Sequence, residues 1–115
     1  MAVLKSMTKN KVLIPDLKVA KTFAERGFGL IPRKNISQAE GLWISECKSI
    51  HTFFMSFTID CVFVDKNLNV KALVENISPW RFTKFYWKAD SVIELAAGSI
   101  GRLEIELGDQ LHVGH

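Results

Sequence analysis

Long apolar stretches are absent from this chain, and their absence excludes proteins that span a membrane. Every apolar run is short and ends at a polar or charged residue, so none approaches the roughly 20 apolar residues of a spanning helix. The first residues also lack the apolar core and the small-residue cleavage site of a signal peptide. We therefore expect a cytoplasmic protein that makes no contact with a membrane.

Cysteine is scarce as well, and this excludes a scaffold stabilised by disulfides. The 115 residues include only Cys47 and Cys61. A chain of this length buries roughly two thirds of its unfolded surface in one core, so it needs no cross-link. We expect reduced thiols, a flexible segment over residues 1–9, and one monomeric domain over residues 10–115.

Positive charge is concentrated in one part of the sequence, although the net charge is only +3. Residues 1–35 carry eight basic and two acidic side chains, whereas the remainder is net negative. The basic residues are spaced singly, no aromatic residues are interleaved with them as in a stacking platform, and no nucleic-acid-binding motif is present. We interpret the basic region as a solvated face, and nucleic acid is not an expected partner.

Short runs of β-branched and aromatic residues predict a mainly β structure. The runs on either side of Pro15-Asp16 form an edge hairpin or one bent strand, and residues 65–69 form a hairpin turn. The predicted strands cover residues 9–14, 17–20, 41–45, 49–54, 59–64, 70–74, 91–95 and 111–113. Tryptophan is among the largest side chains of a small domain, so we expect Trp43, Trp80 and Trp87 in the core or half-buried.

Two short helices are predicted among the strands. Thr22 and Glu25 have the spacing of a capping box, so one helix should begin at Thr22 and end before Pro32. Apolar residues at helical spacing predict the other over residues 99–107, capped by the serine at its start. The predicted class is α+β and mainly β, with a small barrel or a strongly curved, antiparallel-rich sheet and two short helices.

A chemically suggestive cluster lies between residues 47 and 55. On one extended strand, Cys47, His51 and Met55 would share a face. A thiolate, an imidazole and a thioether are ligands that suit copper. Residues four apart on a flat strand are about 13 Å from each other, so binding one ion requires a bulge or a sharp bend. Without such a bulge or bend, Cys47 and Met55 are core residues and His51 is hydrogen-bonded in place. No cofactor is expected.

The same residues allow an enzyme as an alternative. Cys47 would act as the nucleophile and His51 as the base, with Asp60 or Glu94 orienting the imidazole. The spacing of these residues matches no known hydrolase signature. A binding role is therefore favoured over catalysis.

Asp60 interrupts an apolar strand. It either faces solvent or is buried and paired, and Arg26 or Arg33 is its natural partner through a bidentate guanidinium contact. Two interpretations stay open. In the first, an ion pair fixes a helix against the sheet; in the second, these three residues and His51 line a polar pocket for a small anionic ligand.

Several blocks of the sequence carry a family resemblance. The longest contains Ser-Ile-His-Thr, then Met, then Ile-Asp and a Val-Phe-Val-Asp strand. In chain order the blocks are Arg26–Arg33, Glu40–Ile44, Cys47–Asp65, Pro79–Arg81, Val92–Gly98 and Leu107–Leu111. Over roughly residues 10–113 they resemble the family known as domain of unknown function 192.

The resemblance implies a small, barrel-like, mainly β domain from a family found in bacteria and archaea, with no agreed biochemical activity. Two positions depart from the family pattern. Phe54 stands where the nearest subfamily has a residue that looks like glycine, and Ser56 stands where Arg or Lys is frequent. The second departure removes a basic group that would bind an anion at that place.

These observations favour a binding or interaction module over an enzyme. Its partner would be a small anionic ligand in a polar pocket, or another protein. The alternatives are soft-metal handling of the copper type and an enzyme that uses Cys47 and His51.

Overall fold

The computed structural model describes residues 2–20, 22 and 29–115 and confirms a mainly β protein. Within these residues there are seven strands and one short helix. The elements are β1 (Ala2–Ser6), β2 (Lys11–Ala20), β3 (Glu40–Ile44), β4 (Ile59–Val64), β5 (Val70–Ile77), β6 (Ser91–Ala96), α2 (Ser99–Leu103) and β7 (Leu111–Gly114). In this described part of the chain, no helix is long and apolar enough to cross a membrane.

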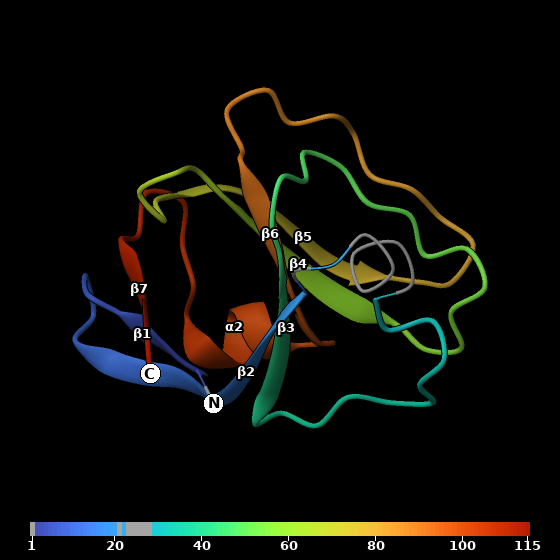
Figure 1. Ribbon diagram of the computed structural model, residues 1–115, viewed down its shortest axis with the longest axis horizontal. Coiled ribbons are helices and arrows are strands. Elements are labelled where there is room, and N and C mark those ends of the chain that lie inside the picture. Colours follow the sequence, from blue (N-terminus) through green and yellow to red (C-terminus); the bar gives the residue numbers. More distant parts are fainter. Residues whose placement is uncertain (1, 21, 23–28) are drawn as a thin grey trace.

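The strands form one mixed sheet in the order β5-β4-β6-β3-β2-β1-β7. β2 and β3 run parallel, and the other neighbouring pairs run antiparallel. The sheet curls strongly into a half-barrel (Figure 1), and an isolated β-bridge between Asn69 and Gln110 connects the segments at its two edges. The predicted curved, antiparallel-rich sheet is therefore confirmed as a half-barrel.

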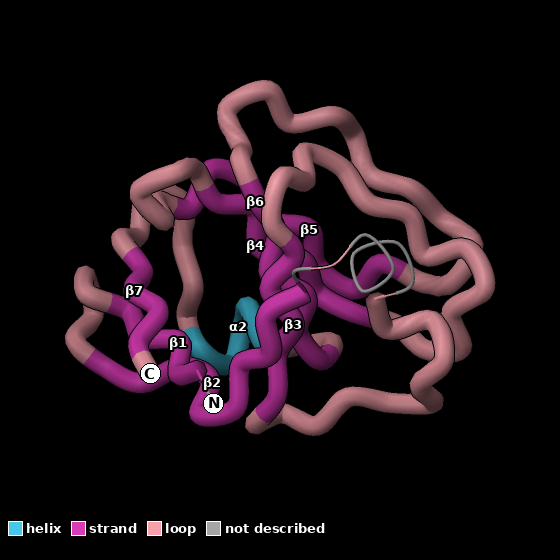
Figure 2. The backbone as a smooth tube through the Cα atoms, in the orientation of Figure 1, coloured by secondary structure: helices cyan, strands magenta, loops and turns pink. Residues whose placement is uncertain are grey.

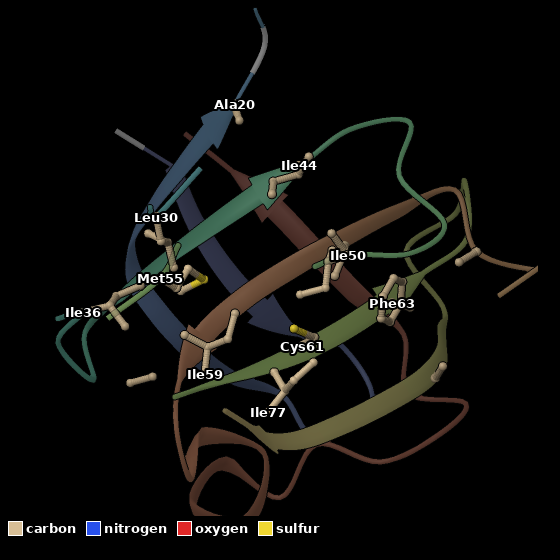
Figure 3. Close-up of a cluster of buried hydrophobic side chains, with 14 residues drawn as sticks. Ala20, Leu30, Ile36, Ile44, Ile50, Met55, Ile59, Cys61, Phe63 and Ile77 are labelled. Carbon is tan, nitrogen blue, oxygen red and sulfur yellow. The ribbon is translucent and has the colours of Figure 1, made fainter. Parts of the chain in front are cut away.

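Two neighbouring strands of the sheet, β4 and β6, are buried on both faces. Successive side chains of a strand point to opposite faces, so each strand contributes to two apolar clusters. The inner core lies inside the curl and joins Val62 and Ile93 to side chains of β1, β2 and β7. The outer core contains Cys61 and Val92 together with loop residues such as Met55 (Figure 3).

In the part of the chain that the structure describes, irregular segments and no second sheet cover the outer core (Figure 2). We call residues 45–58 the first cover loop and residues 78–90 the second cover loop. Residues 49–54 of the first loop were predicted as a strand, and this is wrong. The positive φ of Phe54, 68°, breaks the extended conformation, and the backbone of the loop bonds mainly to the second cover loop.

The N-terminal residues differ from the flexible segment expected over residues 1–9. Ala2–Ser6 form β1, which pairs with β2 on one side and β7 on the other. Ala2 and Leu4 are buried in the inner core. Two inward-facing apolar residues are too few to predict a strand from the sequence. They are enough to hold the segment as a strand when β2 and β7 pair with it on both sides.

The predicted helices differ from the observed structure in two ways. Most of the helix expected from Thr22 falls on residues 23–28, outside the described residues, while residues 29–32 form turns. The second helix ends at Leu103 instead of residue 107, because Glu104 takes a left-handed conformation with φ 57°. The hydroxyl group of Ser99 is buried without a hydrogen-bond partner in the described part of the chain, so this residue does not cap α2.

Asp60 connects β4 to two neighbouring elements. It is fully buried, and its carboxylate accepts the N–H of Asn76 at 2.8 Å and the N–H of Ile100 at 2.9 Å. Asn76 lies at a bulge of β5, and Ile100 lies in the first turn of α2. Amides at a bulge and at a helix start lack backbone partners, so the carboxylate satisfies both and fixes these elements to β4.

Replacing Asp60 with alanine is expected to lower the free energy of unfolding by about 3 kcal/mol or more, because two amides lose a charged acceptor in a buried place. Asp60→Asn should cost less, since its amide oxygen still accepts one N–H. Chemical denaturation of both variants measures the difference. An unchanged midpoint for Asp60→Ala would contradict a structural role and return Asp60 to the candidate ligand-binding residues.

Candidate functional site

A cavity of about 120 Å³ lies over the outer core, between β6, the end of β3 and the first cover loop. Polar and sulfur-bearing side chains from these separate elements converge on it. The lining consists of Gly29, Leu30, Ile31, Ile44, Cys47, Ser49, Ile50, His51, Met55 and Glu94. Cys47, His51 and Met55, which the sequence singled out together, thus meet at one cavity.

A bent backbone brings these three side chains together. Glu46 and Phe54 have φ values of 52° and 68°, which interrupt an extended conformation at both ends of the segment. The N–H of Cys47 donates to the carbonyl of Asp90 at 2.9 Å, so the segment is attached to the second cover loop. On a flat strand, residues four apart would lie about 13 Å from each other. The bent backbone removes this constraint on Cys47, His51 and Met55.

Glu94 brings a buried carboxyl group to the cavity. It lies in the middle of β6, opposite Leu42 of β3 and Cys61 of β4, and is only 4% exposed. Its carboxyl group has no hydrogen-bond or ion-pair partner within the described residues, and burial raises its pKa to about 7. A β-carbon built on Gly29 would lie 3.7 Å from Oε1 of Glu94, so the loop backbone passes close above this carboxyl group.

The thiol and imidazole groups have local partners. Sγ of Cys47 donates to the carbonyl of Ser49 at 2.9 Å, and Nδ1 of His51 accepts the N–H of Phe53 at 3.3 Å. An accepting Nδ1 places the proton of the neutral ring on Nε2. No disulfide joins Cys47 to Cys61, and burial raises the pKa of the Cys61 thiol well above its usual value. Cys61 is therefore an unreactive thiol of the outer core.

The donor types at the cavity suit a soft or borderline metal ion, but their arrangement sets a limit. Over residues 2–20, 22 and 29–115, no three His, Cys, Asp or Glu side chains are placed to hold a metal ion. A metal site here would need the thioether of Met55 in addition to Cys47 and His51. A metal site at this cavity therefore depends on Met55.

The residues predicted to bind an anion are dispersed in the described structure. Arg33 donates from Nη1 and Nη2 to the two carboxylate oxygens of Glu40, each at 3.2 Å, and lines a different cavity of about 300 Å³. This contact lowers the pKa of Glu40 to about 2. Asp60 is occupied by backbone amides, His51 lines the smaller cavity, and Arg26 lies outside the described residues.

Glu94 is the cavity residue that the sequence singles out least, because its residue type and position suggest only one of two carboxylates able to orient His51. A signal for it is present in the sequence. Val92 and Ala96, two positions away on each side, share its face of the strand and are apolar. A carboxylate between two apolar residues on one strand face is either paired, exposed or directed into a polar site.

Glu94→Gln is expected to stabilise the protein at neutral pH and to leave its stability unchanged in mild acid. Below the unfolded pKa of 4.5, Glu94 is protonated in both states and contributes no difference. Between pH 4.5 and about 7 the unfolded chain releases this proton while the folded protein keeps it, so the stability of the wild type falls. The accumulated loss is about 3 kcal/mol, which the variant avoids. Denaturant unfolding across this pH range measures it.

Glu75→Gln is the matched control for this experiment, because Glu75 is an exposed carboxylate on β5. The control should follow the wild-type pH dependence. Parallel curves for the wild type and Glu94→Gln would contradict a buried carboxyl group without a partner.

Comparison with known proteins identifies relatives in sequence and a solved structure with the same fold. It is 37% identical to the UPF0127 protein of Thermococcus sibiricus over 108 residues, covering 90% of this chain and 70% of the relative. It is 31% identical to the UPF0127 protein of Pyrococcus furiosus over 109 residues, covering 92% and 93%. A crystal structure of a protein of unknown function from Novosphingobium aromaticivorans shares the fold with a TM-score of 0.81, at 20% identity over 96% of this chain and 82% of that one.

A family model matches nearly the whole chain. Residues 4–113 match domain of unknown function 192, a family described as uncharacterized ACR. The match covers the half-barrel from β1 to β7 and includes the lining of the cavity. The resemblance identified from the sequence is thereby confirmed, and the chain belongs to the domain of unknown function 192 family, which includes the UPF0127 proteins.

Proposed function

We propose that this protein is a small binding module whose cavity takes a compact cationic ligand, with Glu94 as the partner of the ligand's positive charge. The observation that supports it is a carboxyl group that is 4% exposed, lines a cavity and has no partner within the described residues. An ionised group that is buried without a partner is costly, and proteins normally pair it. A cation supplied by the ligand removes that cost only in the bound state.

The dimensions and lining of the cavity restrict the ligand. Its volume of about 120 Å³ is well below the roughly 300–1,000 Å³ of pockets that hold drug-sized molecules, so the ligand has few atoms. Leu30, Ile44 and Ile50 provide apolar walls, while His51 and Ser49 add polar groups. A short alkylamine combines the charge that pairs with Glu94 and the apolar group that these walls accommodate.

A small anionic ligand or a protein partner, expected from the sequence, remains a prediction. An anion in this cavity would meet the carboxyl group of Glu94, and like charges in one site repel. Arg33 is engaged by Glu40 and lines the other cavity. The arrangement of the described residues therefore favours a cation over an anion.

Methylammonium and acetate provide a direct test, because they are similar in size and opposite in charge. Methylammonium is expected to raise the melting temperature of the wild-type protein at about pH 8, where Glu94 is ionised. It should raise that of Glu94→Gln much less, since the variant lacks the charge. Thermal unfolding with increasing concentrations of each ion measures both effects.

Glu75→Gln serves again as the control, because it removes one exposed carboxylate and should respond to methylammonium like the wild type. Stabilisation by acetate alone would contradict the cationic ligand and support the anionic one. An equal response of Glu94→Gln and the wild type would show that Glu94 is not the partner.

A soft metal ion of the copper(I) type is a second candidate, favoured by the convergence of Cys47, His51 and Met55 on the same cavity. Thiolate, imidazole and thioether form a donor set that suits copper(I). The neighbouring carboxylate of Glu94 would add negative charge close to such an ion. The bend of the first cover loop supports this candidate, because the three residues do not lie along one flat strand.

Copper(I) competition with a chromogenic chelator under anaerobic conditions tests this candidate. Cys47→Ser, His51→Ala and Met55→Leu are each expected to weaken copper binding at least tenfold. His112→Ala, which removes an exposed imidazole on β7, should bind like the wild type. Copper binding that His51→Ala does not change would exclude this metal site.

A further inference from the structure

The two cover loops carry a cluster of exposed aromatic side chains, which we call the aromatic face. Between 53% and 81% of each side chain is exposed to solvent. The residues of the aromatic face are Phe54, Trp80, Phe82, Phe85 and Trp87. The prediction of core or half-buried tryptophans is thus correct for Trp43 and wrong for Trp80 and Trp87. Exposed apolar clusters of this kind mark interaction surfaces.

Hydrogen bonds between the loops hold the aromatic face in place. The buried hydroxyl of Thr52 donates to the carbonyl of Ser78 at 2.6 Å and accepts the N–H of Arg81 at 3.0 Å. Nζ of Lys48 donates to the carbonyl of Trp87 at 3.2 Å. The loops therefore run side by side away from β3, β4 and β6 (Figure 1), and their aromatic side chains start from a fixed backbone.

The exposed rings pack on one another in pairs. The ring centroids of Phe54 and Trp80 are 4.8 Å apart, and those of Phe85 and Trp87 are 4.9 Å apart. Phe54 and Trp80 both have left-handed backbones, with φ of 68° and 65°. Bulky side chains rarely adopt this conformation because it is strained, and strained residues cluster at functional surfaces.

Basic side chains are interleaved with these rings. The second cover loop reads Trp-Arg-Phe-Thr-Lys-Phe-Tyr-Trp-Lys from residue 80 to residue 88, and no acidic residue occurs between residues 78 and 89. Arg81, Lys84 and Lys88 are exposed, and no ion pair engages them in the described part of the chain. Apolar rings and positive charge are therefore exposed together on the second cover loop.

We infer that the aromatic face docks on the surface of an anionic lipid membrane. Tryptophan and phenylalanine enter the interface between lipid headgroups and acyl chains, while arginine and lysine attract anionic headgroups. The positive charge of residues 81–88 is complementary to such a surface. The sequence-based expectation of no membrane contact relied on the lack of a spanning segment, and docking on the surface needs none.

The geometry favours lipid over the other occupants of an aromatic and basic surface. None of the aromatic-face residues lines the two cavities described above. Bases that stack on protein rings need open ring faces, and Trp80 is partly covered by its contacts with Phe53 and Phe54. A fluid membrane requires neither a groove nor an open ring face.

Vesicle co-sedimentation tests this inference with the full chain. The protein is expected to bind vesicles of phosphatidylcholine and phosphatidylglycerol and to bind vesicles of phosphatidylcholine alone at least tenfold more weakly. Tryptophan fluorescence should shift to shorter wavelength on binding, because Trp80 and Trp87 leave water. The temperature of unfolding, measured for every variant, identifies any change that acts through the fold.

Two sets of exposed substitutions separate the contributions of the rings and of the charge. Phe82→Ser combined with Trp87→Ser should weaken binding at least tenfold, and so should Arg81→Gln combined with Lys84→Gln. The matched controls are Met7→Ser with Leu107→Ser, and Lys5→Gln with Lys66→Gln. They remove similar exposed groups elsewhere on the molecule and should bind like the wild type.

Other outcomes would overturn the inference. Lack of binding to anionic vesicles, or equal losses in the variants and their controls, would exclude a specific membrane face. Binding of single-stranded poly(U) without binding of vesicles would identify a nucleic-acid surface instead. A dimer in sedimentation equilibrium that Phe82→Ser with Trp87→Ser dissociates would show that a second copy covers the aromatic face.

Discussion

The pairing of β4 with β6 is the constraint on which the rest of the structure depends. The ladder runs from Ile59 opposite Ala96 to Val64 opposite Ser91, and both strands are buried on both faces. Each side chain must therefore enter either the inner or the outer core. The curl of the sheet closes the inner core, because β1, β7 and α2 return to it. Among the described residues no second sheet lies above the outer core, and irregular segments cover it instead.

That difference explains the positions and roles of two buried carboxylates. Asp60 points to the inner side, where the bulge of β5 and the start of α2 present unpaired amides, and it is fully satisfied there. Glu94 points to the outer side, where the covering loops direct their own hydrogen bonds at each other and leave a cavity. A polar group that interrupts an apolar pattern and is compensated locally is structural, whereas one without compensation marks a candidate functional site.

The outer side also unites the cavity with the aromatic face. The first cover loop contributes Cys47, His51 and Met55 to the cavity and Phe54 to the exposed surface. His51 belongs to the cavity lining and stacks on Phe53, with ring centroids 5.0 Å apart. Both features arise because loops that cover a core are attached to each other and not to a sheet. Their tips are therefore free to present side chains either inward or to the surroundings.

The sequence by itself determined the elements whose causes are local. The strand over 59–64 and the hairpin turn after it follow from an apolar run and from Asp65, whose carboxylate accepts the N–H groups of Asn67 and Asn69 at 2.9 Å. The extended runs on either side of Pro15 form one strand, β2, which agrees with the prediction of one bent strand and not with that of an edge hairpin. The family resemblance also depends on sequence alone, and it implied a small, barrel-like, mainly β domain.

Only the tertiary structure decided the features that rest on contacts distant in sequence. Residues 49–54 have the composition of a strand, but Thr52 bonds to Arg81, 29 residues away, and this pairing makes the segment a loop. The same pairing brings Cys47, His51 and Met55 to one cavity and turns Trp80 outward. Whether Glu94 has a partner depends on which loop lies above it. The alternation of apolar and polar residues along a strand indicates which side chains are buried. Which segment of the chain packs on those side chains is decided only when the chain has folded.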